Sequence, residues 1–331
     1  AADPRVAFVS DDGVVQALDT LPTGIDRIDA EPATSPTANA TGPAIAVIDT
    51  GSGPHPDLNI AGGKNCSTGR SFNDGNGHGT HVAGTIAAKN DGAGVVGVLP
   101  GAPIYSVRVL NNSGSGTFAT IICGIDWVTA NAAAKNIKVA NMSLGGAGAD
   151  GGTCAATAQA LQKAICNSIA AGVTYVVAAG NSNVDFKDSV PATYDQVLTV
   201  TAVADFDGRP GGLGAATCRT DVDETPADFS SFAVLASDQA HTIAGPGVCI
   251  LSDWLKNGFN TISGTSMATP HVAGAAARCI ASTACAGLTP AQIMAKLRAD
   301  AAAMPASYGF TGDPNSPIAG RYYGFLVKGN Y

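Results

Sequence analysis

Residues 262–274 read Ile-Ser-Gly-Thr-Ser-Met-Ala-Thr-Pro-His-Val-Ala-Gly, a stretch that places a serine at the start of an alanine-rich helical run. Ser266 follows closely on Gly264, which has no Cβ and so lets another backbone approach. At the N-terminus of a helix, unpaired N–H groups and the helix dipole favour a developing negative charge. A serine that merely caps the helix would read the same way, so the role of Ser266 depends on the rest of the chain.

Two segments nearer the N-terminus hold the partners that a nucleophilic serine requires. Residues 44–51, Ala-Ile-Ala-Val-Ile-Asp-Thr-Gly, are typical of a buried parallel strand that carries Asp49 near its C-terminal end. Residues 77–84, Gly-His-Gly-Thr-His-Val-Ala-Gly, open a helix with His78 in its first turn. Histidine can take the proton of a serine near neutral pH, and a buried carboxylate fixes its tautomer. The pattern therefore predicts a triad of Asp49, His78 and Ser266.

Together these three motifs resemble those of the subtilisin family of serine proteases, and within it the proteinase K-like branch. The triad residues follow one another in the order Asp, His, Ser that subtilisin has, and the likeness covers about residues 18–303. The resemblance implies a secreted serine endopeptidase of broad specificity that forms an acyl-enzyme on Ser266. It also implies that Asn181, which follows Gly180 after an apolar strand, donates to the oxyanion together with the Ser266 N–H.

Other interpretations of the same residues agree less well with the chain. A sedolisin-type peptidase shares the Gly-Thr-Ser signature, but its base is a glutamate, whereas the His78 motif is intact here. An α/β-hydrolase esterase requires a Gly-x-Ser-x-Gly elbow and the order Ser, Asp, His, and neither occurs around Ser266. A non-catalytic scaffold on this fold would usually have lost a triad residue or Asn181. The four remaining histidines are expected in structural or loop positions: His55, His81, His241 and His271.

Glycine-rich segments near the predicted triad indicate where an extended peptide would bind between two edges. One edge is formed by Gly114, Ser115 and Gly116, and the opposing edge by Ser143, Leu144, Gly145 and Gly146. The walls of the primary specificity pocket would be Ser143–Gly146 together with Ala178, Ala179 and Gly180. These walls are small and uncharged, which favours an apolar or aromatic residue before the scissile bond. Phe118 would shape an outer subsite, and the alternative is that the glycines are plain loop residues.

A second loop has the composition of a calcium site. Residues 89–95, Lys-Asn-Asp-Gly-Ala-Gly-Val, interrupt the helix that begins at His78 and alternate carbonyl groups with an acid. The resemblance implies a structural calcium ion there, and the matching ligands are the side chains of Asp19, Asp57 and Asp91 with the carbonyls of Lys89, Ala93 and Val95. Asp19 stands where we expect a glutamine in the family, so it would add charge. A solvated acidic loop is the alternative.

The resemblance also suggests a weaker second calcium site, as in proteinase K. It would use Asp205 with the carbonyls of Asp195 and Val197.

The composition of the chain agrees with an α/β fold. Its 331 residues include 41 glycines and 13% charged residues, the net charge is −8, and no apolar run reaches membrane-spanning length. The negative charge disfavours nucleic-acid partners. Alanine-rich helices alternate with β-branched strands, which predicts a doubly wound, mainly parallel sheet with helices on both faces. We expect strands at 44–48, 104–109, 138–142, 173–178 and 197–203, and helices at 78–88, 117–133, 155–171, 265–281 and 289–302.

Eight cysteines, an even number without the tight spacing of zinc sites, indicate disulfides and an oxidising compartment. Sequence alone permits about 105 pairings. No cysteine adjoins a triad motif, so a thiol protease is disfavoured. The pairs that we expect are Cys218–Cys249, Cys66–Cys123, Cys154–Cys166 and Cys279–Cys285.

The two ends of the chain lie outside the expected catalytic domain, residues 18–303. Residues 1–17 resemble the last strand and tail of the inhibitory prodomain of subtilisin-like zymogens, so we expect either a prodomain remnant or a divergent N-terminal strand. Residues 304–331 are expected to form a surface strand and loop. The expected partners are protein or peptide substrates and the enzyme's own prodomain, and we expect a secreted monomer.

Overall fold

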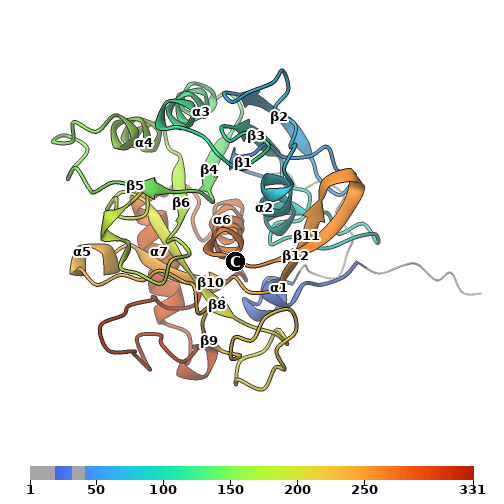
Figure 1. Cartoon of the computed structure of the whole chain (residues 1–331), viewed down its shortest axis with the longest axis vertical. Helices are drawn as coiled ribbons and strands as arrows, with labels where there is room; N and C mark the ends of the chain where they lie inside the picture. Colours follow the sequence, from blue (N-terminus) through green and yellow to red (C-terminus); the bar gives the residue numbers. More distant parts are fainter. Residues whose placement is uncertain (1–18, 32–41) are drawn as a thin grey trace, which may run out of the picture.

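The computed structural model describes residues 19–31 and 42–331, and the expected prodomain remnant, residues 1–17, lies outside the described residues. Seven parallel strands form the central sheet (Figure 1). Their order across the sheet is β10 (Thr242–Pro246), β8 (Leu198–Ala204), β6 (Thr174–Ala178), β4 (Ile137–Met142), β1 (Ala44–Asp49), β3 (Ile104–Arg108) and β2 (Ile60–Asn65). A short strand, β9 (Thr225–Pro226), pairs with β8 in the antiparallel direction.

The five strands expected from the sequence are present, each to within one residue at either end. Their central positions are buried on both sides, as the unbroken apolar runs indicated. Two parallel strands of the central sheet were missed. β2 contains a Gly62-Gly63 pair and lies half exposed at the sheet edge, and β10 ends in Gly245-Pro246, so neither has the apolar run of a central strand.

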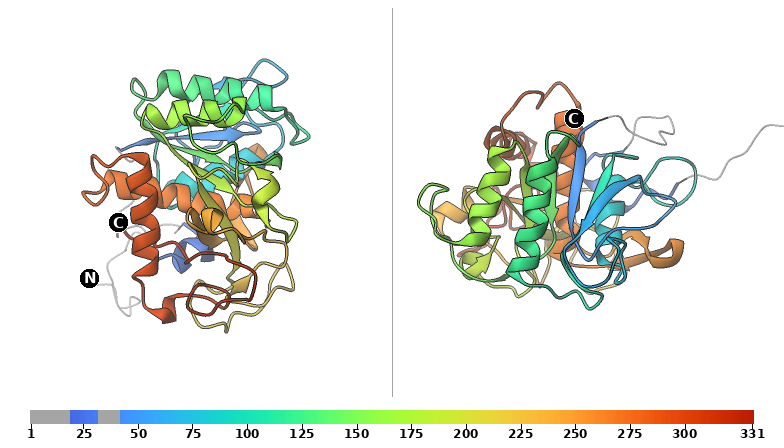
Figure 2. Two further views of the ribbon diagram at one scale, coloured as in Figure 1. Left: turned by 90° about the vertical axis from the view of Figure 1, so that its left-hand side faces the viewer. Right: turned by 90° about the horizontal axis from the view of Figure 1, so that it is seen from above.

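Helices cover both faces of the sheet (Figure 2). α3 (Phe118–Asn131) and α4 (Ala160–Ala170) pack on one face. α2 (His78–Ala87), α6 (Thr265–Ala281) and α7 (Pro290–Ala302) pack on the other, and α6 is buried along almost its whole length. This arrangement confirms the predicted doubly wound α/β fold.

The expected helix 155–171 begins five residues later than predicted, at Ala160. The reason is local, because the Thr157 hydroxyl accepts from the Gln159 N–H and Thr153 accepts from the Ala156 N–H. Such side-chain bonds offer the backbone an alternative to a helix.

Several shorter elements complete the fold. Two antiparallel pairs lie outside the main sheet: β5 (Gly146–Ala147) with β7 (Ser189–Val190), and β11 (Ile250–Trp254) with β12 (Gly258–Ile262). The short helices are α1 (Thr23–Arg27), α5 (Ala236–Gln239) and the 3₁₀ turns Phe186–Asp188, Leu255–Asn257 and Ala306–Tyr308. Among the described residues, no helix combines the length and the apolar character needed to cross a membrane.

Four disulfides join the pairs expected from the sequence: Cys66–Cys123, Cys154–Cys166, Cys218–Cys249 and Cys279–Cys285. The C-terminal segment differs from expectation in part, because residues 315–321 are exposed but the residues that follow them belong to the core. Tyr323, Leu326 and Val327 are buried in the same cluster as α6, and the Val327 N–H donates to the Ala244 carbonyl of β10. Burial of these apolar side chains supplies the driving force.

Candidate active site

The predicted catalytic residues lie where parallel strands end at one edge of the sheet. Asp49 is the last residue of β1, Ser143 directly follows β4, and Asn181 comes shortly after β6. Ser266 is the second residue of α6, which starts after Gly264. In an open α/β sheet, ligands bind outside this edge.

Asp49 and His78 form an acid–imidazole pair. Nδ1 of His78 lies 2.8 Å from Oδ1 of Asp49, whose side chain is fully buried. A Cβ on Gly79 would lie 1.9 Å from the carbonyl oxygen of Gly51, so only glycine lets α2 begin this close to the end of β1. Burial lowers the pKa of His78, but the charge and hydrogen bond of Asp49 raise it by more, so this pKa lies above its ordinary value. The pair leaves Nε2 of His78 as the nitrogen available for proton transfer.

Ser266 is held against the strand that ends at Ser143. Its hydroxyl donates to the Ser143 carbonyl at 3.2 Å, and the Ser143 hydroxyl donates to the Ser266 carbonyl at 2.8 Å. The second bond exists because Pro270, four residues further on, has no N–H with which to claim that carbonyl. The proline of the Ser-Met-Ala-Thr-Pro motif therefore connects the first turn of α6 to the end of β4.

Asn181 has an amide orientation that its neighbours fix. Oδ1 accepts from the backbone N–H and from the hydroxyl of Thr265, each at 2.8 Å. Because a backbone N–H can only donate, the atom facing it must be the oxygen, and Nδ2 faces the other way with its protons free to donate. The Thr265 hydroxyl in turn accepts from the Gly180 N–H at 3.1 Å. The sequence did not single out Thr265, which binds the serine motif to the asparagine motif.

A pocket of about 310 Å³ opens beside Ser266 and Asn181. Six of the expected wall residues line it, and Ser143 lines the neighbouring cleft instead. The sequence missed a third wall, where β7 pairs with β5. Among the described residues that line the pocket, none is charged: Leu144, Gly145, Gly146, Ala178, Ala179, Gly180, Asn181, Ser182, Ser189, Val190, Ala192, Thr265 and Ser266.

A larger cleft of about 660 Å³ runs between the two expected peptide-binding edges. Phe118 lies at its margin and is 46% exposed, so the ring is free to contact a ligand. The lining includes all the residues expected at the two edges, together with Phe118, His78 and five residues that the sequence did not indicate. The full set is Thr50, Asn76, His78, Leu110, Gly114, Ser115, Gly116, Thr117, Phe118, Ile121, Ser143, Leu144, Gly145 and Gly146.

The loop expected to hold calcium surrounds the carboxylate of Asp57. Oδ1 accepts from the Lys89 N–H at 3.0 Å and Oδ2 from the Val95 N–H at 3.2 Å, so both ends of the loop meet at this acid. Asp19 accepts from the Gly92 N–H with one oxygen, and its other oxygen is buried without a hydrogen-bond partner among the described residues. An orphaned carboxylate oxygen beside acids and carbonyls fits an oxygen-preferring cation.

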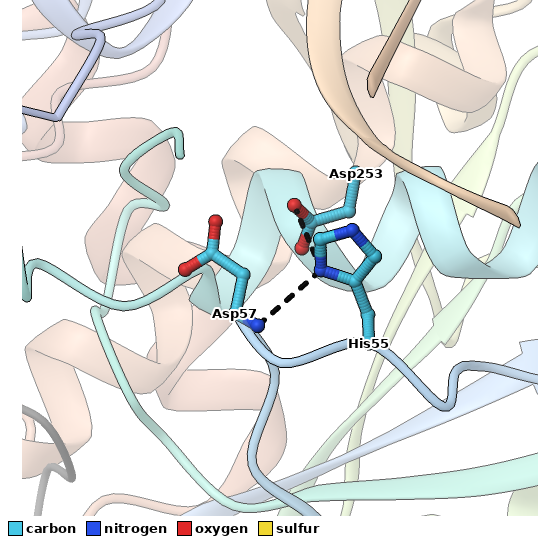
Figure 3. A group of neighbouring side chains, drawn as sticks. All are labelled: His55, Asp57 and Asp253. Atoms are coloured by element: carbon cyan, nitrogen blue, oxygen red, sulfur yellow. Dashed lines mark hydrogen bonds and ion pairs between the residues drawn. The ribbon is translucent and has the colours of Figure 1, made fainter. Parts of the chain in front are cut away.

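Behind Asp57 lies a second acid that the sequence did not single out. Figure 3 shows Asp253 of β11 facing His55, with its Oδ1 3.4 Å from Nδ1 of the ring. The Asp57 N–H donates to this same Nδ1, and Nε2 donates to the Gly258 carbonyl at 3.1 Å. His55 is therefore neutral, in accordance with its burial, which lowers its pKa. Burial, and then the charge of Asp57, raise the pKa of Asp253.

The expected second calcium site is wrong. Asp195 and Val197 precede β8, whereas Asp205 follows it. A strand rises by about 3.3 Å per residue, so about 25 Å separates Val197 from Asp205. Asp205 instead lies close to Asp207 and Asp223, and Asp195 lies close to Asp238 and His241.

Comparisons with known proteins agree with this geometry. The model of the Subtilase family matches residues 40–324. Subtilisin DY from Bacillus licheniformis is 39% identical over 263 residues, which are 78% of this chain and 84% of that protein. Alkaline elastase YaB from Bacillus sp. (strain YaB) is 39% identical over 279 residues, 83% of this chain and 64% of that protein. The crystal structure of a cold adapted subtilisin-like serine proteinase superposes with a TM-score of 0.68 at 30% identity, covering 96% of this chain and 100% of that one.

Proposed function

The chain belongs to the subtilase family of serine peptidases, and from this premise we propose that Ser266 is its nucleophile, His78 the general base and Asp49 the acid that orients His78. The observation that carries the proposal is the 2.8 Å contact between Nδ1 of His78 and a fully buried Asp49. In that contact, Nδ1 of His78 carries the hydrogen and donates it to Asp49, so Nε2 is free to take the proton of Ser266. Ser266 would then attack the scissile carbonyl, and His78 would protonate the leaving amine.

The oxyanion of the tetrahedral intermediate would be held by Nδ2 of Asn181 and by the Ser266 N–H. Support comes from the orientation of the Asn181 amide, which Thr265 fixes before any substrate binds. A donor that is already oriented stabilises the transition state more than one that must first reorient. The Ser266 hydroxyl, which donates to the Ser143 carbonyl, would have to rotate to reach His78.

The substrate is proposed to bind as an extended strand between the two edges of the 660 Å³ cleft. The side chain before the scissile bond would enter the uncharged 310 Å³ pocket, which favours an apolar or aromatic residue of moderate size. Phe118 would contact a residue further from the bond, and specificity would otherwise be broad.

A calcium ion is proposed at the loop 89–95 to stabilise the fold. Asp19, Asp57 and Asp91 would supply carboxylate oxygens, and Lys89, Ala93 and Val95 would supply carbonyls. When bound, the ion would neutralise the carboxylates that converge on this loop.

The remaining proposals concern the protein in the cell. Four disulfides favour an oxidising compartment, which supports secretion. Residues 1–17 would be a remnant of the enzyme's own inhibitory prodomain, with a mature start near Leu18 that N-terminal sequencing of active protein would detect. Placement on the proteinase K-like branch rests on the motifs alone, and we expect a monomer.

The test of the activity is labelling with a fluorophosphonate, followed by intact mass and peptide mapping, beside a casein digestion assay. We expect a single adduct on Ser266 and loss of digestion in proportion to labelling. The Ser266→Ala variant is the control and should neither label nor digest casein. Labelling of another serine, or digestion by the Ser266→Ala variant, would contradict the assignment.

A further inference from the structure

Asp205, Asp207 and Asp223 bring three carboxylates together at the C-terminal end of β8. Asp205 directly follows this strand, Asp207 lies two residues further on, and Asp223 comes from a loop that ends just before β9. One carboxylate oxygen from each lies within 4.8 Å of the others. Asp205 and Asp223 are buried, whereas Asp207 is exposed and opens the cluster to solvent. Like charges at this distance repel each other unless a positive charge lies among them.

The carboxylate of Asp223 closes a loop around the cluster. Its Oδ1 accepts from the Phe206 N–H and its Oδ2 from the Gly214 N–H, both at 2.8 Å. A Cβ on Gly214 would lie 2.8 Å from Oδ1 of Asp223, so a side chain at this position would push the carboxylate away. Both ends of loop 206–214 therefore meet at one acid, and loop 89–95 is closed by a single carboxylate in the same way.

Asp205 has a buried oxygen that the protein leaves unpaired. The residue is 1% exposed, and its Oδ1 accepts from the Gly208 N–H at 2.9 Å. Among the described residues, its Oδ2 has no hydrogen-bond partner, which is rare for a buried polar atom. Burial, and then the charge of Glu224, raise the pKa of Asp205 to about 7. Oδ2 of Asp205 is therefore the oxygen of the cluster that gains most from a cation.

The nearby guanidinium of Arg27 is bound to other groups. Its Nε and Nη2 donate to Glu224 at 2.7 and 2.6 Å, and Nη2 also donates to the Tyr308 carbonyl. Its Nη1 has no partner among the described residues, so it does not satisfy Oδ2 of Asp205, which lacks one as well. Arg27 thus neutralises Glu224, and the three carboxylates of the cluster keep a net negative charge.

The donors and their separations suit calcium. All three side chains offer carboxylate oxygens, and the cluster contains no histidine or cysteine of the kind that selects transition metals. Calcium–oxygen bonds of about 2.3–2.6 Å allow two ligands of one ion to lie up to about 5 Å apart. Separations within 4.8 Å are therefore within its reach. Magnesium, with bonds of about 2.0–2.1 Å, spans only about 4.2 Å.

A pocket of about 330 Å³ borders the cluster at Asp223 and gives room for water ligands. Its other wall is formed by residues of the C-terminal segment 306–316. Asp313 of this segment lines the pocket and is 1% exposed, and its Oδ2 also lacks a partner among the described residues. Calcium takes about six to eight oxygen ligands. Three carboxylates would therefore leave positions that water from this pocket can fill.

We propose that Asp205, Asp207 and Asp223 bind a calcium ion at the C-terminal end of β8, with water completing its coordination. This site shares no ligand with the calcium site proposed at loop 89–95, and it does not depend on the proposed peptidase activity. The ion would pair with the unpaired oxygen and offset the repulsion among the three acids. It would also fix loop 206–214, most of which is exposed, onto the end of a buried central strand.

The test is calorimetric titration of chelator-treated, fluorophosphonate-inhibited protein with calcium chloride. The wild type should bind one calcium ion more than Asp205→Asn. Asp207→Asn, which changes an exposed side chain, should bind that ion at least about 10-fold more weakly, because calcium affinity depends on the charge of the ligands. Asp228→Asn is the matched control, since Asp228 is an acid of the same loop region, 64% exposed and outside the cluster. Its affinity should stay within about twofold of the wild type.

Melting temperatures provide the second readout. In chelator, Asp205→Asn should melt no lower than the wild type, because the amide removes an unpaired buried charge. Calcium should then raise the melting temperature of the wild type and of Asp228→Asn more than that of Asp205→Asn.

Two results would overturn the proposal. One is an equal number of calcium ions, bound with equal affinity, in the wild type, Asp205→Asn and Asp207→Asn. Such equality would mean that water, and not a cation, bridges Oδ2 of Asp205 to Nη1 of Arg27. The other is an Asp205→Asn variant that melts well below the wild type in chelator, since the carboxylate would then have a partner within the protein. Both readouts use inhibited protein, so they are independent of peptidase activity.

Discussion

The amide of Asn181 allows stability and catalysis to be separated by two substitutions at one position. Oδ1 accepts two hydrogen bonds from Thr265, both at 2.8 Å, and Nδ2 is proposed to donate to the oxyanion. Asn181→Ala removes both functions. Asn181→Asp keeps an oxygen toward Thr265 and replaces only the proposed donor, by an anionic oxygen.

The expected magnitudes differ accordingly. Loss of two hydrogen bonds at about 0.5–1.5 kcal/mol each should lower the free energy of unfolding of Asn181→Ala by about 1–3 kcal/mol. Asn181→Asp should unfold within about 1 kcal/mol of the wild type, because its carboxylate still accepts from Thr265. In contrast, kcat should fall in both variants. Removal of one oxyanion donor costs about 10²–10³ in kcat, or about 2.7–4 kcal/mol, and the like charge in Asn181→Asp should make its loss at least as large.

The assay is steady-state hydrolysis of a chromogenic peptide, paired with urea unfolding of the fluorophosphonate-inhibited proteins. Ser182→Ala is the control, because Ser182 lines the same pocket, and it should keep kcat within about twofold. If Asn181→Asp kept kcat within about 10-fold of the wild type, Asn181 would not be the oxyanion donor. A loss confined to KM in both variants would equally refute the reasoning, since an interaction made only in the transition state acts on kcat.

Three further outcomes are expected. Asp49→Asn should lower kcat/KM by about 10⁴. Because Asp49 raises the pKa of His78 and the neutral ring is the active form, the acid limb of the pH–rate profile should also move to lower pH. An acid limb that does not move would contradict the pairing of Asp49 with His78. A chelator should lower the melting temperature of the inhibited wild type more than that of Asp57→Asn, with the exposed Asp126→Asn as control, and equal shifts in all three would remove the calcium proposal at loop 89–95. Glu224→Gln should lower the free energy of unfolding in urea by about 3–5 kcal/mol, because it leaves the buried Arg27 without a counter-charge. In the wild type, Glu224 accepts two hydrogen bonds from the Arg27 guanidinium, at 2.7 and 2.6 Å. A decrease below about 1 kcal/mol would mean that water replaces the carboxylate.

The central sheet and the residues at its carboxyl edge could be predicted because each has a local signal. Strands such as β1 are unbroken apolar runs, and Asp49 stands where such a run ends, which in a parallel sheet is the binding edge. The turn glycines and the start of α6 before Ser266 are equally local. Since these signals lie within a few residues of the groups they position, their convergence follows from the fold class.

The parts that could not be predicted depend on pairings between distant residues. The third wall of the pocket comes from β5 and β7, which have two residues each and so no periodicity to detect. The ion pair of Arg27 with Glu224 joins residues 197 positions apart. The C-terminal segment was expected on the surface because residues 308–314 are rich in turn residues, yet Leu326 bridges to Ala244 and lies in the core.

Histidines 55 and 241 show how far chemistry can differ at sites with the same composition. Each is buried and faces two aspartates, so residue types and spacing alone would treat both clusters alike. The two histidines differ in the group that contacts Nδ1 of the ring. A backbone N–H occupies Nδ1 of His55, whereas a threonine hydroxyl with its own proton already committed forces a hydrogen onto Nδ1 of His241. The first ring has no lone pair to offer, and the second directs one at two carboxylates.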